Sequence, residues 1–475
     1  MNGEKVDAIV VGAGPAGIAA AMTLAQAGLE VIVAERGEYP GSKNVMGGIL
    51  YAHPLNELVP RFWERAPLER PIVQQNLWLL DSQAAFTVGF RDPELGREPY
   101  NSFSVFRAQF DRWFASQAEE AGVHLATRTL VKELLVSEGQ VCGVRTGAGE
   151  ELRADVVILA EGVNALLTRQ LLGLKEIPPE QVAVGVKEVI SLDPGRIEER
   201  FGLEKGQGAA IEMAGEATKG LVGVAFLYTN RESVSLGLGV MASELKRART
   251  TPYELLDALK SHPAVARLIA GGQVEEYAAH LIPEGGFRNM PRLYGPGFLV
   301  VGDAAMLVNH IHREGSNLAI TSGRLAAQAV LAAKEKGDFS AAGLSLYGEL
   351  LAQSFVLLDL WTYAWAEPQA FEKVPELFPQ LGSLACSLGR KLMLVNGRPK
   401  LATFHDMFAE VVARIPAERI KVLAEAMLGE EAMRAKPPRL AGRPSWATAE
   451  RPAQGGTVVT RVAPSSQAAS GGQEP

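Results

Sequence analysis

Residues 6–17 read Val-Asp-Ala-Ile-Val-Val-Gly-Ala-Gly-Pro-Ala-Gly, and this stretch decides the fold. A short apolar run leads into Gly12, Gly14 and Gly17, while Pro15 and Ala16 open a segment rich in Ala and Leu. A pyrophosphate approaches the backbone at such a helix N-terminus, because free N–H groups and the helix dipole attract it. Side chains at the first two glycines would block that approach, and the third glycine lets the helix pack on the strand. The stretch therefore predicts a Rossmann-type dinucleotide site.

An acidic residue follows at the position where this fold requires one. Residues 16–27 have helical spacing, Gly28 stands where a helix C-terminus favours glycine, and residues 31–34 form a second apolar strand. Glu35 closes this strand about 18 residues beyond Gly17, near the spacing for a carboxylate on the adenosine ribose. Strand, helix and acid together favour a bound dinucleotide over a glycine-rich turn without a ligand.

Two later strands end in signatures that narrow the ligand. Residues 156–160 run through Ala160 into Glu161 and Gly162, and residues 298–301 run into Gly302 and Asp303. In order and spacing, these segments resemble the second and third signatures of the para-hydroxybenzoate-hydroxylase-like flavoprotein superfamily. The resemblance implies FAD, with the carboxylate of the Gly-Asp pair at the ribityl chain. The usual Asp of the second signature is Glu161 here, which keeps the acidic group. Alone, Gly302-Asp303 would be an ordinary turn at a strand end.

The same resemblance implies a helix whose N-terminus points at the flavin. Residues 316–334 have the composition of that helix, and Gly315, Ser316 and Asn317 stand at its start. The positive end of a helix stabilises the negative charge of reduced flavin. These three residues are therefore candidates for tuning the flavin through their N–H groups.

A helix and a hairpin lie between the first and second signatures. Residues 107–121 have amphipathic spacing, and residues 130–146 are predicted to form a hairpin that turns at Glu138-Gly139. Arg107 opens the helix where this superfamily often directs an arginine to the diphosphate, although a solvated arginine at a helix start is an equal alternative. Val131, at the start of the hairpin, is included with Ala160 among the expected cofactor contacts.

The chain divides into several regions that differ in residue pattern and composition. Residues 72–90 and 185–240 show strand-like alternation with many glycines, and we expect both pieces in one antiparallel or mixed sheet. The predicted architecture is α/β: a discontinuous Rossmann-type FAD-binding domain of the glutathione-reductase or para-hydroxybenzoate-hydroxylase type (1–71, 104–183, 290–338) and an interleaved mixed β-sheet domain (72–103, 184–289). A helical C-terminal region (339–435) follows. Residues 436–475 are rich in Pro, Gly, Ser and Gln, so a disordered tail is expected there.

Composition excludes several functions. The chain has 475 residues and a net charge of −7, whereas a nucleic-acid binder usually shows a basic excess. It has two cysteines, far apart and without metal-ligand spacing, while an iron–sulfur cluster needs about four ligands. We therefore expect no metal site.

No uninterrupted apolar run approaches the length of a spanning helix, and residues 6–34 contain glycines where a signal peptide would need an unbroken helix. A cytoplasmic location is expected.

Further blocks extend the resemblance to a smaller family. Residues 35–37 continue into 40–51, which read Pro-Gly-Ser-Lys-Asn-Val-Met-Gly-Gly-Ile-Leu-Tyr. Residues 280–286 read His-Leu-Ile-Pro-Glu-Gly-Gly, and residues 312–319 read His-Arg-Glu-Gly-Ser-Asn-Leu-Ala. Over roughly residues 5–435 the chain resembles the FixC branch of the electron-transfer-flavoprotein:quinone oxidoreductase family. These combined blocks are more specific than the glycine fingerprint.

The FixC resemblance implies a redox subunit rather than a separate metabolic enzyme. It implies FAD, the alpha and beta subunits of an electron-transfer flavoprotein, a small ferredoxin-like iron–sulfur protein and a quinone. Such an assembly bifurcates electrons from NADH between the quinone and a low-potential ferredoxin or flavodoxin. The quinone oxidoreductases proper carry a four-iron cluster in the same chain, and two cysteines cannot hold one. This departure favours the FixC branch, in which the cluster lies on a separate chain.

Several residues in these blocks are candidates for the site. Gly47 and Gly48 would let the backbone approach the isoalloxazine, and Arg36, Lys43 and Asn44 are further candidate cofactor contacts, with a loop-surface role for Lys43 and Asn44 about equally favoured.

Two histidines precede the helix that points at the flavin. His310 and His312 are candidates to relay protons to a reduced quinone or to the flavin N5 atom, although a structural role is the commoner one for a histidine.

The quinone requires an apolar slot, and two regions are candidates for it. The sheet of residues 72–90 and 185–240, together with the aromatic helices near Trp361 and Trp365, would build the slot and contact a membrane surface peripherally. A plain helical core is the alternative for those aromatic residues.

Three other functions remain open at this point. They are a prenyl reductase of the geranylgeranyl type, a flavin monooxygenase that binds NAD(P)H itself, and an assembly subunit with a structural FAD.

Overall fold

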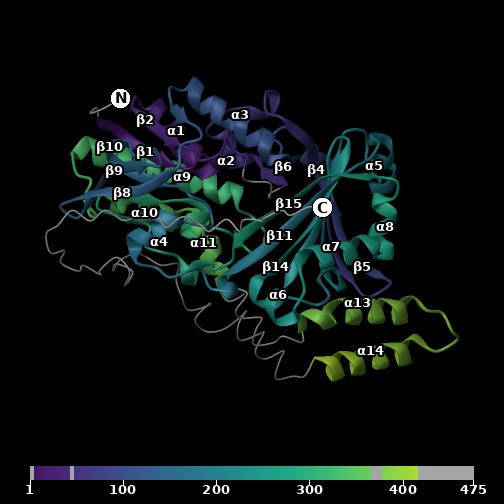
Figure 1. Ribbon diagram of the computed structural model, residues 1–475. Helices are drawn as coiled ribbons and strands as arrows, with labels where there is room; N and C mark the ends of the chain where they lie inside the picture. The colour runs from purple at the N-terminus through teal and green to yellow at the C-terminus, as the bar shows by residue number, and fades with distance from the viewer. Residues whose placement is uncertain (1–4, 43–47, 365–376, 416–475) are drawn as a thin grey trace, which may run out of the picture.

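The computed structural model describes residues 5–42, 48–364 and 377–415. Within them the strands form two sheets that lie side by side, each with its own helices (Figure 1). The expected tail at 436–475, Trp365, Lys43, Asn44 and Gly47 lie outside the described residues. In the part described, no helix has both the length and the apolar composition needed to cross a bilayer.

The first sheet carries the Rossmann-type unit that the glycine stretch predicts. Its central order is β16-β17-β10-β1-β2-β7, and neighbours from β17 to β7 are parallel. The hairpin β8–β9 pairs with the first residues of β10 and turns at Glu138 and Gly139, which both have positive φ. The strands are β1 (Lys5–Val11), β2 (Val31–Ala34), β7 (His124–Ala126), β8 (Val131–Ser137), β9 (Gln140–Thr146), β10 (Glu151–Leu159), β16 (Tyr294–Gly295) and β17 (Phe298–Val300).

Helices cover this sheet because its strands are apolar on both faces. β1 is fully buried from Ala8 to Val11 and β10 from Val156 to Leu159, as expected for parallel strands between two helical layers. Helix α1 packs closely on α9, where a Cβ at Gly323 would lie 2.0 Å from the Ala16 carbonyl oxygen. The helices are α1 (Pro15–Gln26), α2 (Ala52–Asn56), α3 (Arg107–Glu120), α4 (Leu166–Leu172), α9 (Ser316–Lys336), α10 (Leu346–Gln353) and α11 (Phe355–Thr362).

The second sheet is mixed and joins pieces of chain that are distant in sequence. Its order is β15-β11-β14-β13-β12-β4-β6-β3, with β5 also paired to β4. β12 runs parallel to β4, and the other pairs are antiparallel. The strands are β3 (Ile49–Tyr51), β4 (Leu68–Leu80), β5 (Ala85–Arg91), β6 (Ser102–Val105), β11 (Val182–Ser191), β12 (Gly208–Gly215), β13 (Gly223–Thr229), β14 (Ser233–Met241) and β15 (Gln273–Pro283).

The expected α/β architecture with a Rossmann-type unit and an interleaved mixed sheet is confirmed. β3 belongs to the second sheet by its hydrogen bonds, although it lies in the segment 1–71 that we assigned to FAD binding. The division into domains otherwise stays a prediction. The second sheet also has helices of its own: α5 (Pro194–Phe201), α6 (Ala242–Ala248), α7 (Pro252–Ser261), α8 (Pro263–Ile269), α13 (Leu377–Met393) and α14 (Lys400–Arg414).

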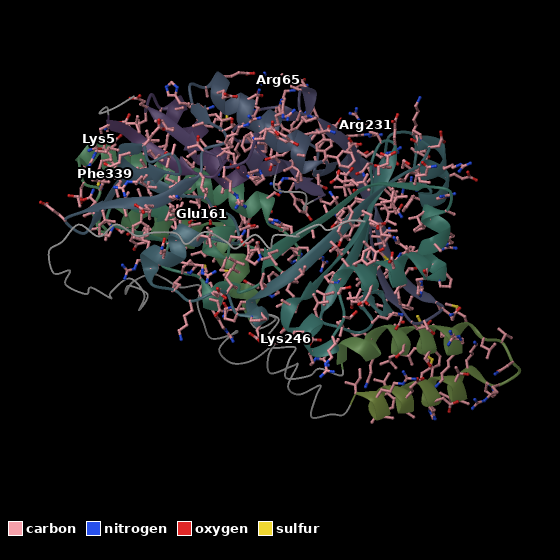
Figure 2. All side chains as sticks on the ribbon, in the orientation of Figure 1. Lys5, Arg65, Glu161, Arg231, Lys246 and Phe339 are labelled. Carbon is pink, nitrogen blue, oxygen red and sulfur yellow. The ribbon has the colours of Figure 1, made fainter. Side chains whose placement is uncertain are left out.

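The last two described helices form a hairpin that extends below the second sheet (Figure 1). α13 packs on β4, β5 and β12, where Leu384 and Cys386 are buried. α14 contacts α13 through polar groups, among them the Lys391 and Ser387 bonds to Glu410, and buries none of its own residues. Many side chains of this hairpin point away from the body of the molecule (Figure 2).

Candidate functional site

The glycines of the loop between β1 and α1 have two different roles: the fold requires two of them, and the third leaves room for a ligand. Gly12 has a φ of +103°, and a Cβ there would lie 2.3 Å from the Ala160 carbonyl oxygen. A Cβ at Gly17 would lie 2.0 Å from the Gly12 carbonyl oxygen. Gly14, the residue before α1, has no heavy atom within 4 Å of the corresponding position. The fold therefore needs Gly12 and Gly17, while Gly14 keeps the helix N-terminus open for a phosphate.

Glu35 lies beside this loop. Its carboxylate accepts the Ala13 N–H at 2.9 Å and the Gly37 N–H at 2.6 Å, which ties the end of β2 to the glycine loop. Each oxygen retains capacity for a ribose hydroxyl. Arg36 is exposed, and Val131 is buried at the start of β8. The contacts of all three residues with the cofactor stay predictions.

Glu161, labelled in Figure 2, has a structural task. Its carboxylate accepts the N–H groups of Leu167 and Thr168, both at 2.8 Å, and the Thr168 hydroxyl at 2.7 Å. These bonds satisfy donors at the start of α4 and fix the turn after β10. Burial raises the pKa of the Glu161 carboxyl, although these hydrogen bonds act in the opposite direction. The carboxylate of Glu161 thus serves as a hydrogen-bond acceptor that holds the turn after β10. Its neighbours Ala160 and Gly162 line the cavity described below.

The Gly302-Asp303 turn follows β17 as the third signature implies. Gly302 has a φ of +62°, and its N–H donates to the Ser322 hydroxyl of α9 at 3.0 Å. Asp303 lines the cavity, and burial raises the pKa of its carboxyl while the nearby charge of Arg107 opposes this. The turn therefore presents one carboxyl to the cavity, where a ribityl hydroxyl would find an acceptor.

Arg107 is buried and links α3 to the start of α9. Its Nε and Nη2 atoms donate to the two carboxylate oxygens of Asp111 at 2.7 and 2.9 Å. Its Nη1 atom lies 3.4 Å from the Ser316 hydroxyl, and the side chain borders the cavity. The structure therefore does not support a solvated arginine at a helix start. A direct contact with the diphosphate stays a prediction.

The N-terminus of α9 faces the same cavity. Gly315, Ser316 and Asn317 all line it, and no side chain caps the helix. The Asn317 amide nitrogen donates to Glu314 at 2.7 Å, whereas its buried Oδ1 atom accepts no hydrogen bond from the described residues. Uncapped N–H groups and an unused amide oxygen fit the polar edge of a flavin. Together with the space at Gly14, they show that this wall suits FAD.

The cavity has a volume of about 380 Å³ and lies between the two sheets. One wall, here called the loop wall, comes from the glycine loop, the strand ends and the start of α9. It brings together many residues that the sequence analysis singled out: Gly14, Pro15, Ala16, Gly48, Arg107, Ala160, Gly162, Asp303, His310, Gly315, Ser316 and Asn317. Glycine-loop geometry, a carboxyl and a helix start therefore meet at one place, as a flavin site requires.

The opposite wall, here called the sheet wall, comes from one face of the second sheet. Residues directly opposite one another on β15, β11, β14 and β13 share this face, and the chain continues it at Glu284. The Phe226 and Tyr228 rings stack at 4.8 Å with an interplanar angle of 13°. A Cβ at Gly48 would lie 2.5 Å from the Tyr228 ring, so glycine is needed there. The wall comprises Ala183, Val224, Phe226, Tyr228, Gly239, Met241, His280, Ile282 and Glu284.

Burial shifts the titration of several groups around this cavity. It raises the pKa of Tyr51 to about 12, and it raises the pKa of Tyr228 as well. It lowers the pKa of His280, with the charges of Arg107 and Arg36 adding to the effect. Burial also raises the pKa of the Glu284 carboxyl to about 8, against the opposing charge of Arg313. The sequence analysis quoted the blocks that hold Tyr51, His280 and Glu284 but assigned these residues no role.

The two candidate histidines lie in different surroundings. His310 lines the cavity. His312 is exposed, and its Nε2 atom lies 2.7 Å from the Tyr363 hydroxyl, with the rings 5.0 Å apart. The structure therefore places His310, and not His312, in the lining of the cavity. A proton relay by either histidine stays a prediction.

Comparison with known proteins agrees with this site. Residues 7–168 match the family model described as FAD dependent oxidoreductase. The fold, the cavity and this match define the class: the chain is an FAD-dependent oxidoreductase.

Curated relatives narrow the class. The chain is 46% identical to "Protein FixC" of Bradyrhizobium diazoefficiens over 84% of its own length and 93% of the relative. It is 40% identical to "Probable electron transfer flavoprotein-quinone oxidoreductase YdiS" of Escherichia coli K12, over the same shares. The chain belongs to the FixC family of electron-transfer-flavoprotein:quinone oxidoreductase-like proteins, as its sequence blocks implied.

Solved structures agree with the fold. A geranylgeranyl bacteriochlorophyll reductase-like protein of Thermoplasma acidophilum superposes with a TM-score of 0.68 at 22% identity, over 89% of this chain and 99% of that one. The myxobacterial halogenase CndH gives a TM-score of 0.60 at 19% identity, over 90% and 98%. At these identities the likeness concerns the fold alone.

Proposed function

We propose that this chain accepts electrons from an electron-transfer flavoprotein and passes them to a quinone. In the proposal it works with the alpha and beta subunits of that flavoprotein and a ferredoxin-like iron–sulfur protein, in NADH-dependent electron bifurcation. The names of the FixC relative and of the Escherichia coli relative support the general activity. FAD supplies the redox chemistry, and the residues of the chain hold it, shape the cavity and admit the acceptor.

The observation that carries this proposal is the contrast between the two walls of one cavity. The loop wall offers backbone N–H groups and a carboxyl, which suit a dinucleotide. The sheet wall offers the stacked rings of Phe226 and Tyr228 and the apolar side chains of Ile282 and Met241. A quinone head is flat and largely apolar, with a few oxygens that need hydrogen bonds, and such a wall fits it.

The residues proposed to hold FAD follow from the loop wall. The pyrophosphate would lie at Gly14 and the start of α1, with Glu35 toward the adenosine ribose. Asp303 would take a ribityl hydroxyl, and the N–H groups from Gly315 to Asn317 would meet the polar edge of the flavin.

The cysteine count supports a separate cluster-bearing partner. The chain has two cysteines, of which Cys142 lies on β9 and Cys386 on α13. A cluster needs about four ligands. The ferredoxin-like partner would therefore carry the iron–sulfur cluster of the assembly.

Anaerobic reconstitution tests the proposal. NADH alone should leave the FAD of this chain oxidised, whereas NADH with the two electron-transfer-flavoprotein subunits should bleach it, and a quinone should then restore the colour. Persistent colour in the presence of reduced electron-transfer flavoprotein would contradict the proposal.

The same experiment separates the other functions. Bleaching by NADH or NADPH alone with oxygen uptake would indicate a monooxygenase. Reduction of a prenyl double bond by the isolated, chemically reduced chain would indicate a prenyl reductase. An FAD that never changes redox state during turnover of the assembly would indicate a structural cofactor.

We further propose that the chain attaches to the cytoplasmic face of the membrane through the tip of the α13–α14 hairpin. Met393, Leu394 and Val395 are 76%, 55% and 86% exposed at that tip. Arg390, Lys391, Arg398 and Lys400 flank these apolar residues. Apolar side chains beside basic ones suit an anionic lipid surface. This place differs from the aromatic helix we expected, since Trp361 is half-buried in α11.

Vesicle binding tests the attachment. The chain should sediment with vesicles that contain phosphatidylglycerol, and replacing Leu394 and Val395 by Ser should release it. Replacing the exposed Leu174, which lies away from the hairpin, by Ser is the matched control. Equal sedimentation of both variants would contradict attachment through the tip.

A further inference from the structure

Glu284 presents a carboxyl to the cavity from a fixed position. It directly follows the last residue of β15, and its N–H donates to the Gln181 carbonyl oxygen at 2.8 Å. Its side chain lines the cavity next to Ile282 on the sheet wall, with His310 and Arg313 lining the same cavity from the loop before α9. The backbone of Glu284 is therefore held at the end of β15, on the sheet wall of the cavity.

The Glu284 carboxyl has no hydrogen-bond or ion-pair partner among residues 5–42, 48–364 and 377–415. Arg313 is the cation whose charge acts on it. That guanidinium is already engaged, because its Nε and Nη2 atoms both donate to the Glu212 carboxylate on β12. Glu284 is partly buried, and its carboxyl lines a largely apolar cavity without a counter-ion among the described residues. Such surroundings favour the protonated form, since ionisation there is costly. Burial accordingly raises the pKa of Glu284 to about 8, so the group is a neutral acid at pH 7.

Three titratable groups of the cavity are poor proton donors at neutral pH. The pKa of His280 is lowered by burial, which leaves it without the extra proton at neutral pH, and the raised pKa values of Tyr51 and Tyr228 make them weak acids. The remaining groups that border or approach the cavity come from five elements: Arg107 of α3, Asp303 of the turn after β17, Glu212 of β12, Lys187 of β11, and His310, Arg313 and Glu314 of the loop before α9.

We propose that Glu284 is the proton donor of this cavity, delivering a proton to a carbonyl oxygen of the bound quinone; the inference rests on the proposed function. Reduction of a quinone to a quinol takes up two electrons and two protons. In the proposed step the O–H bond of the Glu284 acid breaks and an O–H bond forms on the quinone, while reduced FAD supplies both electrons and the second proton. The Glu284 carboxylate then takes a proton from water, which restores the acid.

Infrared spectroscopy of the FAD-loaded chain tests the protonation state without reference to activity. At pH 7 the C=O stretch of the protonated Glu284 carboxyl should appear as a band in the wild-type-minus-Glu284→Gln difference spectrum. The matched control is Glu275→Gln, because Glu275 lies exposed on the same strand and should leave the band in place. Burial also raises the pKa of the Glu161 and Asp303 carboxyls, so only the difference between the two spectra reports on Glu284. A wild-type-minus-Glu284→Gln spectrum without this band would overturn the inference.

Rapid kinetics tests the proton transfer. Glu284→Gln should keep its FAD content and its bleaching by reduced electron-transfer flavoprotein, while reoxidation by a quinone slows by about 100-fold. Glu284→Asp should recover part of that rate. In the wild type, reoxidation should slow as the pH rises through about 8, where the acid loses its proton, and the Gln variant should lack this pH dependence. Reoxidation at the wild-type rate in Glu284→Gln would overturn the inference.

The two proposals fail in distinguishable ways. If a quinone does not reoxidise the reduced wild-type chain, the proposed function fails, and a donor role toward a quinone fails with it. If wild type and Glu284→Gln are reoxidised equally, with equal pH profiles, the proposed function stands and only the role of Glu284 is overturned.

Discussion

The loop wall and the sheet wall of the cavity are built by different means. The loop wall relies on the backbone: a glycine without neighbours at its missing Cβ, a strand-end turn and an uncapped helix start. The sheet wall relies on side chains that alternate along strands from distant parts of the sequence. Backbone geometry suits a cofactor common to a large superfamily, whereas side chains on a sheet can differ among relatives with the same fold. Under the proposed function, the sheet wall would set which acceptor reacts and where protons enter.

The largest expected effect concerns the acid on the sheet wall. Its folded pKa of about 8 lies above the ordinary value of 4.5, so the stability it contributes is present below pH 4.5 and is lost as the pH rises to about 8. Relative to Glu284→Gln, the free energy of unfolding of the wild type should fall by about 1.4 kcal/mol per pH unit in that window, reaching roughly 5 kcal/mol. Denaturant titrations between these pH values measure it. The free energy of unfolding of Glu275→Gln should follow that of the wild type at every pH. If the curve of Glu284→Gln also runs parallel to the wild type, Glu284 is not a neutral acid in the folded chain.

The next effect concerns the buried ion pair behind the loop wall. Arg107→Ala removes both hydrogen-bond donors that Asp111 uses and leaves that carboxylate buried, which should cost about 3–5 kcal/mol of stability. Urea denaturation of the purified variant measures the loss. Replacing both residues by Leu should cost less, because no buried charge remains alone. A double variant less stable than the single one would show that the pair itself holds α3 in place.

A smaller effect separates cofactor binding from folding at the glycine loop. Gly14→Ala adds a methyl group where no protein atom lies within 4 Å, so the FAD-free chain should melt as the wild type does. FAD affinity should fall about tenfold or more, which corresponds to about 1.4 kcal/mol, since the methyl group occupies the approach of the pyrophosphate. Fluorescence titration with FAD measures the affinity. Gly147→Ala, in the exposed loop after β9, is the control. Unchanged affinity in Gly14→Ala would place the pyrophosphate elsewhere.

The smallest effect concerns the ion pair between Arg313, in the loop before α9, and Glu212 of β12. Arg313 and Glu212 are partly exposed, so Glu212→Gln should cost about 1 kcal/mol or less. The released guanidinium would act more strongly on Glu284 and lower its pKa, because an opposite charge favours the ionised carboxyl. Infrared titration of the Glu284 band should therefore show a lower midpoint in Glu212→Gln. A midpoint that does not move would mean that Arg313 does not control this acid.

The same contrast explains how much the sequence reveals. The loop wall was predictable because its glycine spacing and strand-end turn are local in sequence. The same is true of Glu35 at the end of β2 and of the hairpin turn at Glu138-Gly139, whose two positive φ angles match a two-residue loop. The two pieces of the second sheet were also predictable as one sheet from their alternation. Their pairing was not, because β4 lies parallel to β12 more than a hundred residues away.

What the sequence did not reveal depends on register. Alternation along β13 shows that Phe226 and Tyr228 share a face, but only the pairing with β14 and the position of Gly48 show that this face lines the cavity. The raised pKa of Glu284 was not predictable from sequence either. The nearby Arg313 pairs with Glu212, on a strand that is far away in sequence. Helix α5 had local signals that went unused, with Asp193 capping its first turn and Gly202 ending it.

The structure of the FAD-loaded chain with a bound quinone analogue tests the central claim most directly. The account predicts that the pyrophosphate lies at Gly14, that the flavin meets the start of α9 at Asn317, and that the analogue lies between the flavin and the rings of Phe226 and Tyr228. An analogue bound outside this cavity, or a flavin ring placed away from the start of α9, would contradict it.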